Sequence, residues 1–364
     1  MQRTAVMTTS TTPIISISPL ASIASTDFAG SAAGRKDYSE SIKNNEPLIL
    51  HDDSKITYGA QMRDHTTFMI GGRADAYLEA NSPEGLVRAI AGARASGIPY
   101  FVLGGGSNLL IDDKGIAGIV IKNRYKNITI LDSQDFDYLM PSILREEFEK
   151  SVFLLVGSGT KLSELVDFAC DNALTGCEFL SGIPGTFGGA VYGNAGAYGK
   201  GVGDLLVMAK LIDKQSAICC VERDYFNFSY RASRLKTTKE LLLSAVIRLK
   251  RGEKKAVKTE ADKIITERCL KHPPEYIGCA GSYFKNVAPV TPNARRIAAG
   301  YFLELAGAKE MKYGCAKVYS KHANFIINPG GASCAEVLKL ASALKSKVLE
   351  KFGVLLEEEV LYVK

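Results

Sequence analysis

Residues 180–199 read LSGIPGTFGGAVYGNAGAYG, and this stretch decides the fold. Seven of its twenty residues are glycine and none is charged. Glycine permits positive φ angles and close approach of the backbone, and successive free N–H groups form concavities that bind anions. A solvated surface loop is the alternative, but the apolar side chains of Ile183, Phe187 and Val191 disfavour it. The stretch therefore predicts a buried wall against a ligand, able to hold a diphosphate without one lysine for each phosphate.

A second glycine segment lies upstream, where a predicted buried strand at residues 99–103 runs into GGGSN at residues 104–108. The Rossmann fingerprint does not fit, because Leu109 stands at its third glycine position and the chain continues as strand and turn. A P-loop around Lys200 fails as well, since Asn194 replaces its first glycine and Gly201 its Ser or Thr. What remains is a backbone nest that binds a diphosphate between two loops.

The composition is that of a globular protein that is not extreme in any respect. A length of 364 residues favours two domains. The net charge of +6 is spread along the chain, so it suits an anionic small molecule and does not call for nucleic acid. Eight cysteines without paired spacing indicate reduced thiols and a cytoplasmic location, and four histidines make a histidine-built metal site improbable. No apolar run approaches the roughly 20 residues that a membrane span needs.

The order of predicted elements divides the chain into three parts. Residues 1–60 are expected to be a flexible extension, residues 61–252 one domain and residues 253–364 another. Ser82 and Pro83 predict the start of a helix in the first domain, and Thr160 is expected to cap another. The charged residues 132–150 are expected to form an exposed insertion. The last helix opens with a capping box at Ser333, and residues 354–363 are expected to form a final strand.

Seven segments, in the same order along the chain, resemble the UDP-N-acetylenolpyruvoylglucosamine reductase (UDP-N-acetylmuramate dehydrogenase) family. They are residues 66–72, 103–110, 181–199, 228–231, 280–286, 321–328 and 352–360. The resemblance covers residues 62–364 and implies an α+β fold. It consists of a two-subdomain FAD-binding fold of the vanillyl-alcohol-oxidase type and a C-terminal α/β substrate-binding domain. No tyrosine-bearing loop is evident between Arg231 and Ser282, so the chain resembles the short type of the family.

The resemblance implies an enzyme that uses NADPH to reduce non-covalently bound FAD. The flavin then passes hydride to the enolpyruvyl double bond of UDP-N-acetylglucosamine enolpyruvate, which yields UDP-N-acetylmuramate for peptidoglycan. A sugar nucleotide is thus the implied small-molecule partner, and no obligate protein partner is inferred. The residues implied to bind the cofactor are Gly104, Gly105, Gly106, Ser107, Asn108, Ser181, Gly182, Ile183, Gly185, Thr186, Gly189, Asn194, Ala195 and Gly196.

Reduction of an enol ether conjugated to a carboxylate builds negative charge on that carboxylate and then requires a proton at the α-carbon. Arg231 matches the family's charge-stabilising position, and a planar, permanently charged guanidinium suits a carboxylate. Ser282 matches the proton donor. Glu359 matches the catalytic carboxylate, which either orients one of these residues or donates a proton itself. The residues that the resemblance implies for substrate binding are Tyr230, Lys285 and Asn286.

Two other readings compete with this one. One is a different FAD-dependent oxidase or dehydrogenase of the same fold, acting on an alcohol or a sugar. The other is a nucleotide-binding protein without catalysis, which would not bleach with NADPH. Taken singly, Arg231 also reads as a surface arginine in a salt bridge, Ser282 as a turn serine and Glu359 as a solvated glutamate near the terminus.

Overall fold

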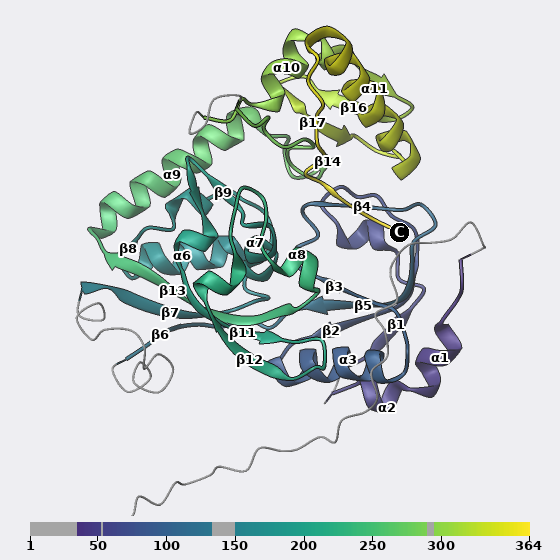
Figure 1. The fold of residues 1–364 in the computed structure, drawn as a ribbon, viewed down its shortest axis with the longest axis vertical. Helices are drawn as coiled ribbons and strands as arrows, with labels where there is room; N and C mark the ends of the chain where they lie inside the picture. Colours follow the sequence, from purple (N-terminus) through teal and green to yellow (C-terminus); the bar gives the residue numbers. More distant parts are fainter. Residues whose placement is uncertain (1–34, 52–53, 133–149, 290–294) are drawn as a thin grey trace, which may run out of the picture.

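The computed structural model describes residues 35–51, 54–132, 150–289 and 295–364. Two sheets with their helices form one lobe, and a third sheet with two helices forms a second lobe (Figure 1). The long helix α9 (Lys254–Lys271) leads from the first lobe to the second. The cleft described below lies where the two lobes meet.

The first sheet has the strand order β1-β2-β5-β3 and is parallel except for β1. Its strands are β1 (Ile56–Tyr58), β2 (Ala74–Ala80), β3 (Tyr100–Leu103) and β5 (Ile116–Asn123). Helix α3 (Pro83–Ala95) connects β2 to β3, and the Ser82 hydroxyl caps it as predicted by accepting from Gly85 N at 3.0 Å. The central strands β2 and β5 are almost wholly buried, as is usual for parallel sheets covered by helices, whereas the edge strands β1 and β3 are only partly buried.

The expectation that residues 1–60 are flexible is wrong for residues 39–49 and 56–58, which form helices and a strand. Helices α1 (Ser39–Asn44) and α2 (Glu46–Ile49) bury Ile42 and Ile49 in the same core as α3, and β1 pairs with β2. Apolar residues in this segment are few, so its hydrophobic pattern is weak, and packing against α3 decides its structure. Residues 1–34 lie outside the described part of the chain.

The second sheet is antiparallel with the order β12-β11-β13-β7-β6. Helices α6 (Leu162–Asp171) and α7 (Phe187–Gly193) pack on it, sharing one core with its strands. Lys161, not Thr160, is the N-cap of α6, because the Thr160 hydroxyl bonds to the Asn127 backbone at 3.1 Å instead. The predicted insertion lies outside the described residues except for residues 132 and 150. The strands are β6 (Ile128–Ile130), β7 (Val152–Gly157), β11 (Leu206–Ile212), β12 (Ile218–Glu222) and β13 (Leu241–Arg251), with β8 (Leu174–Thr175) at the end of β13.

The third sheet, in the second lobe, is antiparallel with the order β14-β17-β16-β15. Helix α11 (Cys334–Phe352) begins with the predicted capping box, since Ser333 and Glu336 bond to each other's backbone N–H, and it ends at Gly353 with φ +67°. The other elements of the second lobe are β14 (Gly278–Cys279), α10 (Ala299–Leu305), β15 (Lys312–Tyr313), β16 (Ala316–Tyr319) and β17 (His322–Asn328). The remaining short elements precede α9 and are α8 (Leu235–Thr238), β9 (Gly196–Ala197) and β10 (Lys200–Gly201). Short 3-10 turns stand at Met62–His65, Glu178–Leu180, Val202–Asp204, Arg223–Phe226 and Ala308–Glu310.

The last strand crosses back from the second lobe to the first (Figure 1). Only Leu361–Val363 (β18) of the predicted final strand is a strand, and it pairs in parallel with β4 (Leu109–Ile111). Because β4 directly follows the GGGSN segment, this pairing brings Glu359 to the first glycine loop. The boundaries 61–252 and 253–364 stay a proposal, with β18 placed on the first lobe.

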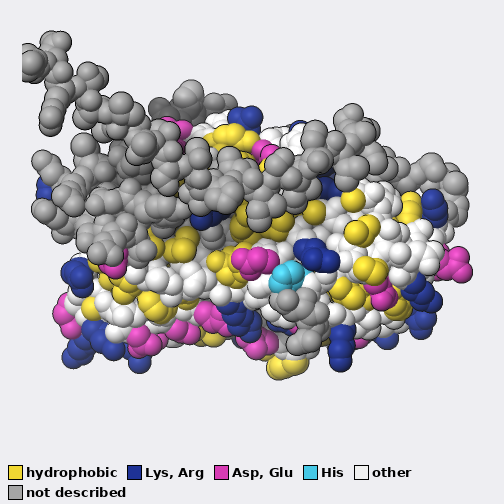
Figure 2. Space-filling model, turned by 90° about the horizontal axis from the view of Figure 1, so that it is seen from below, with side chains coloured by type: hydrophobic (Ala, Val, Ile, Leu, Met, Phe, Trp, Pro, Cys, Tyr) yellow, Lys and Arg dark blue, Asp and Glu magenta, His cyan; other side chains and the backbone are white. Residues whose placement is uncertain are grey.

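Seen from below, acidic and basic side chains are intermixed over the described surface (Figure 2).

Candidate active site

One large cleft contains most of the residues that the sequence singled out. Its walls come from the 104–108 loop, the 182–196 stretch and the facing edge of the second lobe. Arg231, Ser282, Lys285 and Glu359 all line it. Residues from both lobes and from five separate parts of the sequence therefore face one space.

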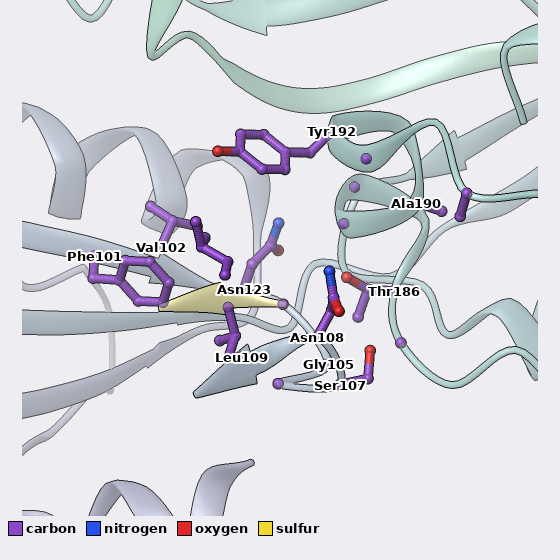
Figure 3. A pocket seen from close by; sticks show the side chains of 18 of the residues that line it. Phe101, Val102, Gly105, Ser107, Asn108, Leu109, Asn123, Thr186, Ala190 and Tyr192 are labelled. Carbon is purple, nitrogen blue, oxygen red and sulfur yellow. The ribbon is translucent and has the colours of Figure 1, made fainter. Parts of the chain in front are cut away.

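The two glycine segments touch each other backbone to backbone at the floor of the cleft (Figure 3). A Cβ on Gly105 would lie 2.4 Å from the Cα of Gly185, and a Cβ on Gly104 would lie 2.6 Å from Thr186 Oγ1. The Ser107 hydroxyl donates to the Pro184 carbonyl at 2.9 Å. Glycine is required here because any larger residue would push the loops apart.

The amide groups of this floor are available to a ligand. Within the described part of the chain, the N–H groups of Gly105, Gly106 and Ser107 donate no hydrogen bond. Gly106 has φ +72°, and a Cβ there would lie 2.3 Å from the His65 carbonyl oxygen. Consecutive unpaired N–H groups with a left-handed residue among them form an anion-binding nest. The residues present thus fit the diphosphate of a dinucleotide cofactor.

Twelve of the fourteen residues predicted to bind the cofactor line the cleft, and Ser181 and Asn194 do not. Asn194 ends α7 in a left-handed conformation, and its side chain donates to Ser229 O at 2.9 Å and accepts from Gly203 N at 3.1 Å. Both ends of this amide are therefore engaged by the backbone, and a cofactor-binding role of Asn194 stays a prediction. The buried Ser181 hydroxyl lies behind the wall and has no partner among the described residues.

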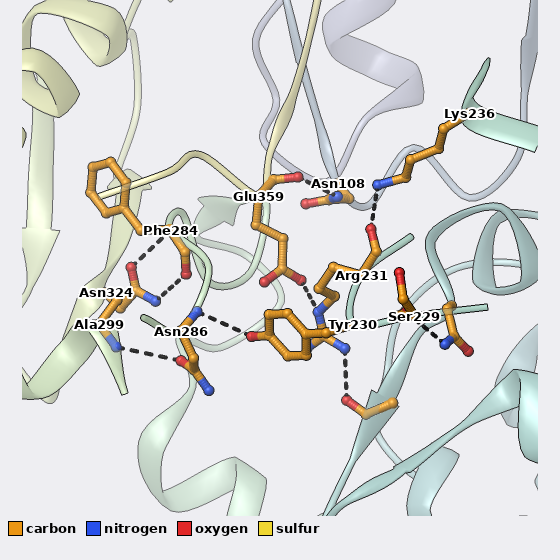
Figure 4. A network of polar contacts seen from close by, with 12 residues as sticks. Asn108, Ser229, Tyr230, Arg231, Lys236, Phe284, Asn286, Ala299, Asn324 and Glu359 are labelled. Atoms are coloured by element: carbon orange, nitrogen blue, oxygen red, sulfur yellow. Dashed lines mark hydrogen bonds and ion pairs between the residues drawn. The ribbon is translucent and has the colours of Figure 1, made fainter. Parts of the chain in front are cut away.

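Arg231 and Glu359 form an ion pair across the lobes (Figure 4). The guanidinium Nε donates to Glu359 Oε1 at 2.5 Å, and Nη1 donates to the Gly196 carbonyl at 3.0 Å. Asn108 Nδ2 donates to the Glu359 carbonyl at 3.0 Å. Arg231 therefore lies between the glycine wall and the last segment of the chain. It is 128 positions away from Glu359 in the sequence. The alternative interpretation of Arg231, a surface salt bridge, does not hold, because the ion pair is partly buried and both residues line the cleft.

Arg231 also has an unusual backbone conformation. Its φ is +54°, in the left-handed region that costs a non-glycine residue about 1 kcal/mol or more. Lys236 Nζ donates to the Arg231 carbonyl at 2.7 Å and also lines the cleft. Sequence reasoning missed Lys236, although it follows Arg231 by only five residues. Strain of this kind is typical of a functional position.

Burial raises the pKa of Glu359 above its ordinary value, even though Arg231, Lys236 and Lys285 act in the opposite direction. The carboxyl side chain is only 16% exposed. A group in this state accepts and releases a proton nearer neutral pH than a solvated glutamate does. Glu358, one residue away, instead pairs with Lys345 at 3.4 Å, as expected when neighbours on an extended chain face opposite ways.

Ser282 lies beside Glu359 on the second lobe. Glu359 N donates to the Tyr283 carbonyl at 2.8 Å, and Phe284 pairs with Glu358, so the two segments run side by side. The Ser282 hydroxyl makes no hydrogen bond within the described residues and is free to face a ligand. The Glu359 carboxylate bonds to Arg231, and within the described residues it makes no hydrogen bond to the Ser282 hydroxyl.

The three predicted substrate residues are near this pair but differ in exposure to the cleft. Lys285 lines the cleft and pairs with Glu357 at 3.1 Å. Tyr230 and Asn286 join the two lobes, since the Asn286 N–H donates to the Tyr230 hydroxyl at 3.1 Å (Figure 4). The Tyr230 ring also lies against the Arg296 guanidinium, 4.1 Å from its centre. Tyr230 and Asn286 are absent from the cleft walls themselves.

Groups of side chains able to hold a metal ion and helices able to span a membrane are both absent from the described residues. No cluster of three or more His, Cys, Asp or Glu side chains among them has the geometry of a metal site. No helix in the described ranges is long and apolar enough to cross a bilayer.

Both lobes match models of known protein families. A family model of an FAD binding domain matches residues 74–219, and a model of the C-terminal domain of UDP-N-acetylenolpyruvoylglucosamine reductase matches residues 272–363. The chain is 36% identical to the UDP-N-acetylenolpyruvoylglucosamine reductase of Caldanaerobacter subterraneus, over 85% of this chain and 94% of that one. It is 33% identical to that of Anoxybacillus flavithermus, over 87% and 97%. The crystal structure of the Thermus caldophilus enzyme superposes with a TM-score of 0.65 at 28% identity, covering 85% of this chain and 99% of that chain.

Proposed function

Because this chain belongs to the UDP-N-acetylenolpyruvoylglucosamine reductase family and is an FAD-dependent oxidoreductase of peptidoglycan precursor synthesis, we propose specific roles for its cleft residues in that reaction. The expected α+β fold, with an FAD-binding part and a C-terminal domain, is confirmed. The competing oxidase reading has no support among relatives that align over most of the chain. The observation that carries the proposed roles is the Arg231–Glu359 pair beside the glycine floor.

When bound, FAD would carry the hydride from the reductant to the substrate. The N–H groups of Gly105, Gly106 and Ser107 hold its diphosphate, and the 182–196 wall excludes water from one side. The two loops pack on each other closely enough that a Cβ on Gly105 would clash with Gly185, and this contact supports the donors from behind. NADPH is the proposed reductant.

Arg231 stabilises the negative charge that grows on the substrate carboxylate. Glu359 and Gly196 hold Nε and Nη1, which leaves Nη2 to donate to the ligand. Glu359 acts as a positioning residue for Arg231, since its carboxyl contacts the guanidinium directly. Its raised pKa lets it take up a proton as charge shifts in the cleft.

Ser282 delivers the proton to the α-carbon. Its hydroxyl is protonated at neutral pH and faces the cleft without a competing partner in the described residues. Lys285, Lys236 and Arg231 line the same cleft, and their positive charge lowers the cost of a transient alkoxide. Tyr230, Lys285 and Asn286 bind the substrate in this proposal. Reduced thiols and a sugar-nucleotide substrate suit a cytoplasmic location, and the proposal includes no obligate protein partner.

The test is anaerobic mixing of the purified protein with NADPH and then with the enolpyruvyl sugar nucleotide, followed through flavin absorbance. Wild type is expected to bleach with NADPH and recover its colour with substrate. Ser282→Ala is expected to bleach at the wild-type rate and to recover at least about 100-fold more slowly, since general acid catalysis contributes about that much. Rapid recovery in the variant would remove Ser282 as the donor. A wild-type protein that bleaches but never recovers would refute the substrate.

A further inference from the structure

A buried ammonium stands directly behind the glycine floor. Lys122, near the end of β5, is 8% exposed, and its Nζ donates to the Gly104 carbonyl at 2.6 Å. The side chain is absent from the cleft walls, so it reaches the loop from the core side. By binding this carbonyl it turns the Gly104 oxygen toward the core and leaves the following N–H groups on the cleft side.

Lys122 has no counter-ion among the described residues. It forms no ion pair there, and Glu79, the acidic side chain whose charge acts on it, is bound to Arg124 at 2.9 Å and to the Tyr77 hydroxyl at 2.7 Å. An unpaired buried charge is unfavourable unless an opposite charge lies close by. The fold retains this cation where the loop in front of it is built to receive an anion.

We propose that Lys122 is a positioning residue that supplies positive charge to the FAD diphosphate through the Gly104 loop. The two glycine segments carry no charged side chain of their own, so the cation behind the loop raises the potential at its N–H groups. The inference rests on the FAD-dependent function. It adds a residue that does not touch the cleft and that no glycine motif identifies.

The charged surroundings make the effect of pH predictable. Burial, followed by the repulsion of Arg124, lowers the pKa of Lys122 to about 8. Its other charged neighbours are Glu79 and Lys161. His65, which packs on Tyr77, has its pKa lowered by burial and stays neutral in this range. A bound dianion favours the ammonium, so FAD affinity should fall as pH rises from 7 to 9 and the free protein loses this proton.

The experiment measures the FAD dissociation constant by flavin fluorescence at pH 7, 8 and 9, and the unfolding temperature with and without FAD. Lys122→Met removes the charge, Lys122→Gln keeps a donor for the Gly104 carbonyl without the charge, and Lys126→Met is the control at an exposed pair with Glu164. Both Lys122 variants should bind FAD at least tenfold more weakly at pH 7 and lose the pH dependence. Without FAD, Lys122→Met should unfold no lower than wild type, since the cost of the buried charge is gone.

Three outcomes overturn the inference while leaving the FAD-dependent function intact. They are wild-type affinity in Lys122→Met, wild-type behaviour of Lys122→Gln across the pH range, and a fall in the FAD-free unfolding temperature of Lys122→Met that accounts for the weaker binding. A wild-type chain that binds no FAD would instead refute the function on which the inference rests.

Discussion

At the scale of single residues, the site depends on side chains held in states that a solvated chain would avoid. Arg231 adopts a left-handed backbone, Glu359 is a buried carboxyl with a raised pKa, and Lys122 is a buried ammonium. Each state has a cost that the neighbouring lobe or loop offsets with a specific contact. Such costs concentrate where a ligand completes the set of charges.

Replacing Arg231 by Lys is expected to lower turnover by about 100-fold or more, because one point charge cannot hold Glu359 and donate to a carboxylate in one plane. FAD absorbance of the purified protein should stay at the wild-type level, since the glycine floor is untouched. Steady-state kinetics with the enolpyruvyl sugar nucleotide measure the loss.

Arg234→Lys is the matched control, because Arg234 is exposed and lies over the Tyr225 ring at 4.4 Å. It should stay within about twofold of wild type, as surface changes usually do. Equal turnover in both variants would show that the carboxylate role of Arg231 is wrong.

At the scale of elements, the end of α9 links the two lobes to the cleft. The helix stops at His272, whose ring packs on Phe325 of β17 with 4.8 Å between ring centres. Arg268, one turn earlier, reaches the wall beside Gly182 and lines the cleft. The sequence offered no sign of either contact, because α9 carries many basic residues and only its packing selects among them.

Burial lowers the pKa of His272 to about 4, so the folded protein keeps this imidazole neutral. The unfolded chain takes up a proton near pH 6.5 and therefore binds more protons than the folded state between about pH 6.5 and 4. Stability from this residue is present above pH 6.5 and is lost as pH falls through that window. His272→Gln removes the titration.

Thermal unfolding at pH 7.5, 6, 5 and 4.5 tests this expectation. The unfolding temperature of wild type should fall relative to that of His272→Gln as the pH decreases below 6.5. His322 and His65 also have lowered pKa values, so some acid sensitivity should persist in the variant. Parallel curves for the two proteins would contradict the assignment.

At the scale of the whole molecule, the C-terminal strand joins lobes that are otherwise separate in sequence. Leu361 N donates to the Asn108 carbonyl at 3.0 Å, and Val363 is 6% exposed in the core of the first sheet. The same crossing carries Glu359 to Arg231. The closed arrangement of the site thus depends on the pairing of β18 with β4.

Deleting residues 361–364 should lower the free energy of unfolding by about 2 kcal/mol or more, as expected for one buried valine and two lost backbone hydrogen bonds. FAD should also bind more weakly, because β4 continues the 104–108 loop. Chemical denaturation and FAD titration measure the two effects. Removal of the exposed Lys364 alone is the control, and equal loss in that shorter deletion would argue against the strand pairing as the cause.

The sequence by itself determined the features that near neighbours encode. The glycine segments, the Ser82 cap, the capping box of α11 and the ordered family segments all depend on residues within a few positions of one another. These sufficed to predict the FAD-binding fold and the cleft that holds Arg231, Ser282 and Glu359.

Only the tertiary structure decided which distant residues meet. How the sheets pack decides the pairing of Glu359 with Arg231, the return of β18 to β4, the docking of α1, α2 and β1, and the position of Lys122 behind Gly104. Long-range contacts leave no local pattern in the sequence. The residues around a charged side chain do not show whether that side chain lies in solvent or in a cleft. The burial of these groups and the partners that offset its cost both exist only once the lobes have packed on each other.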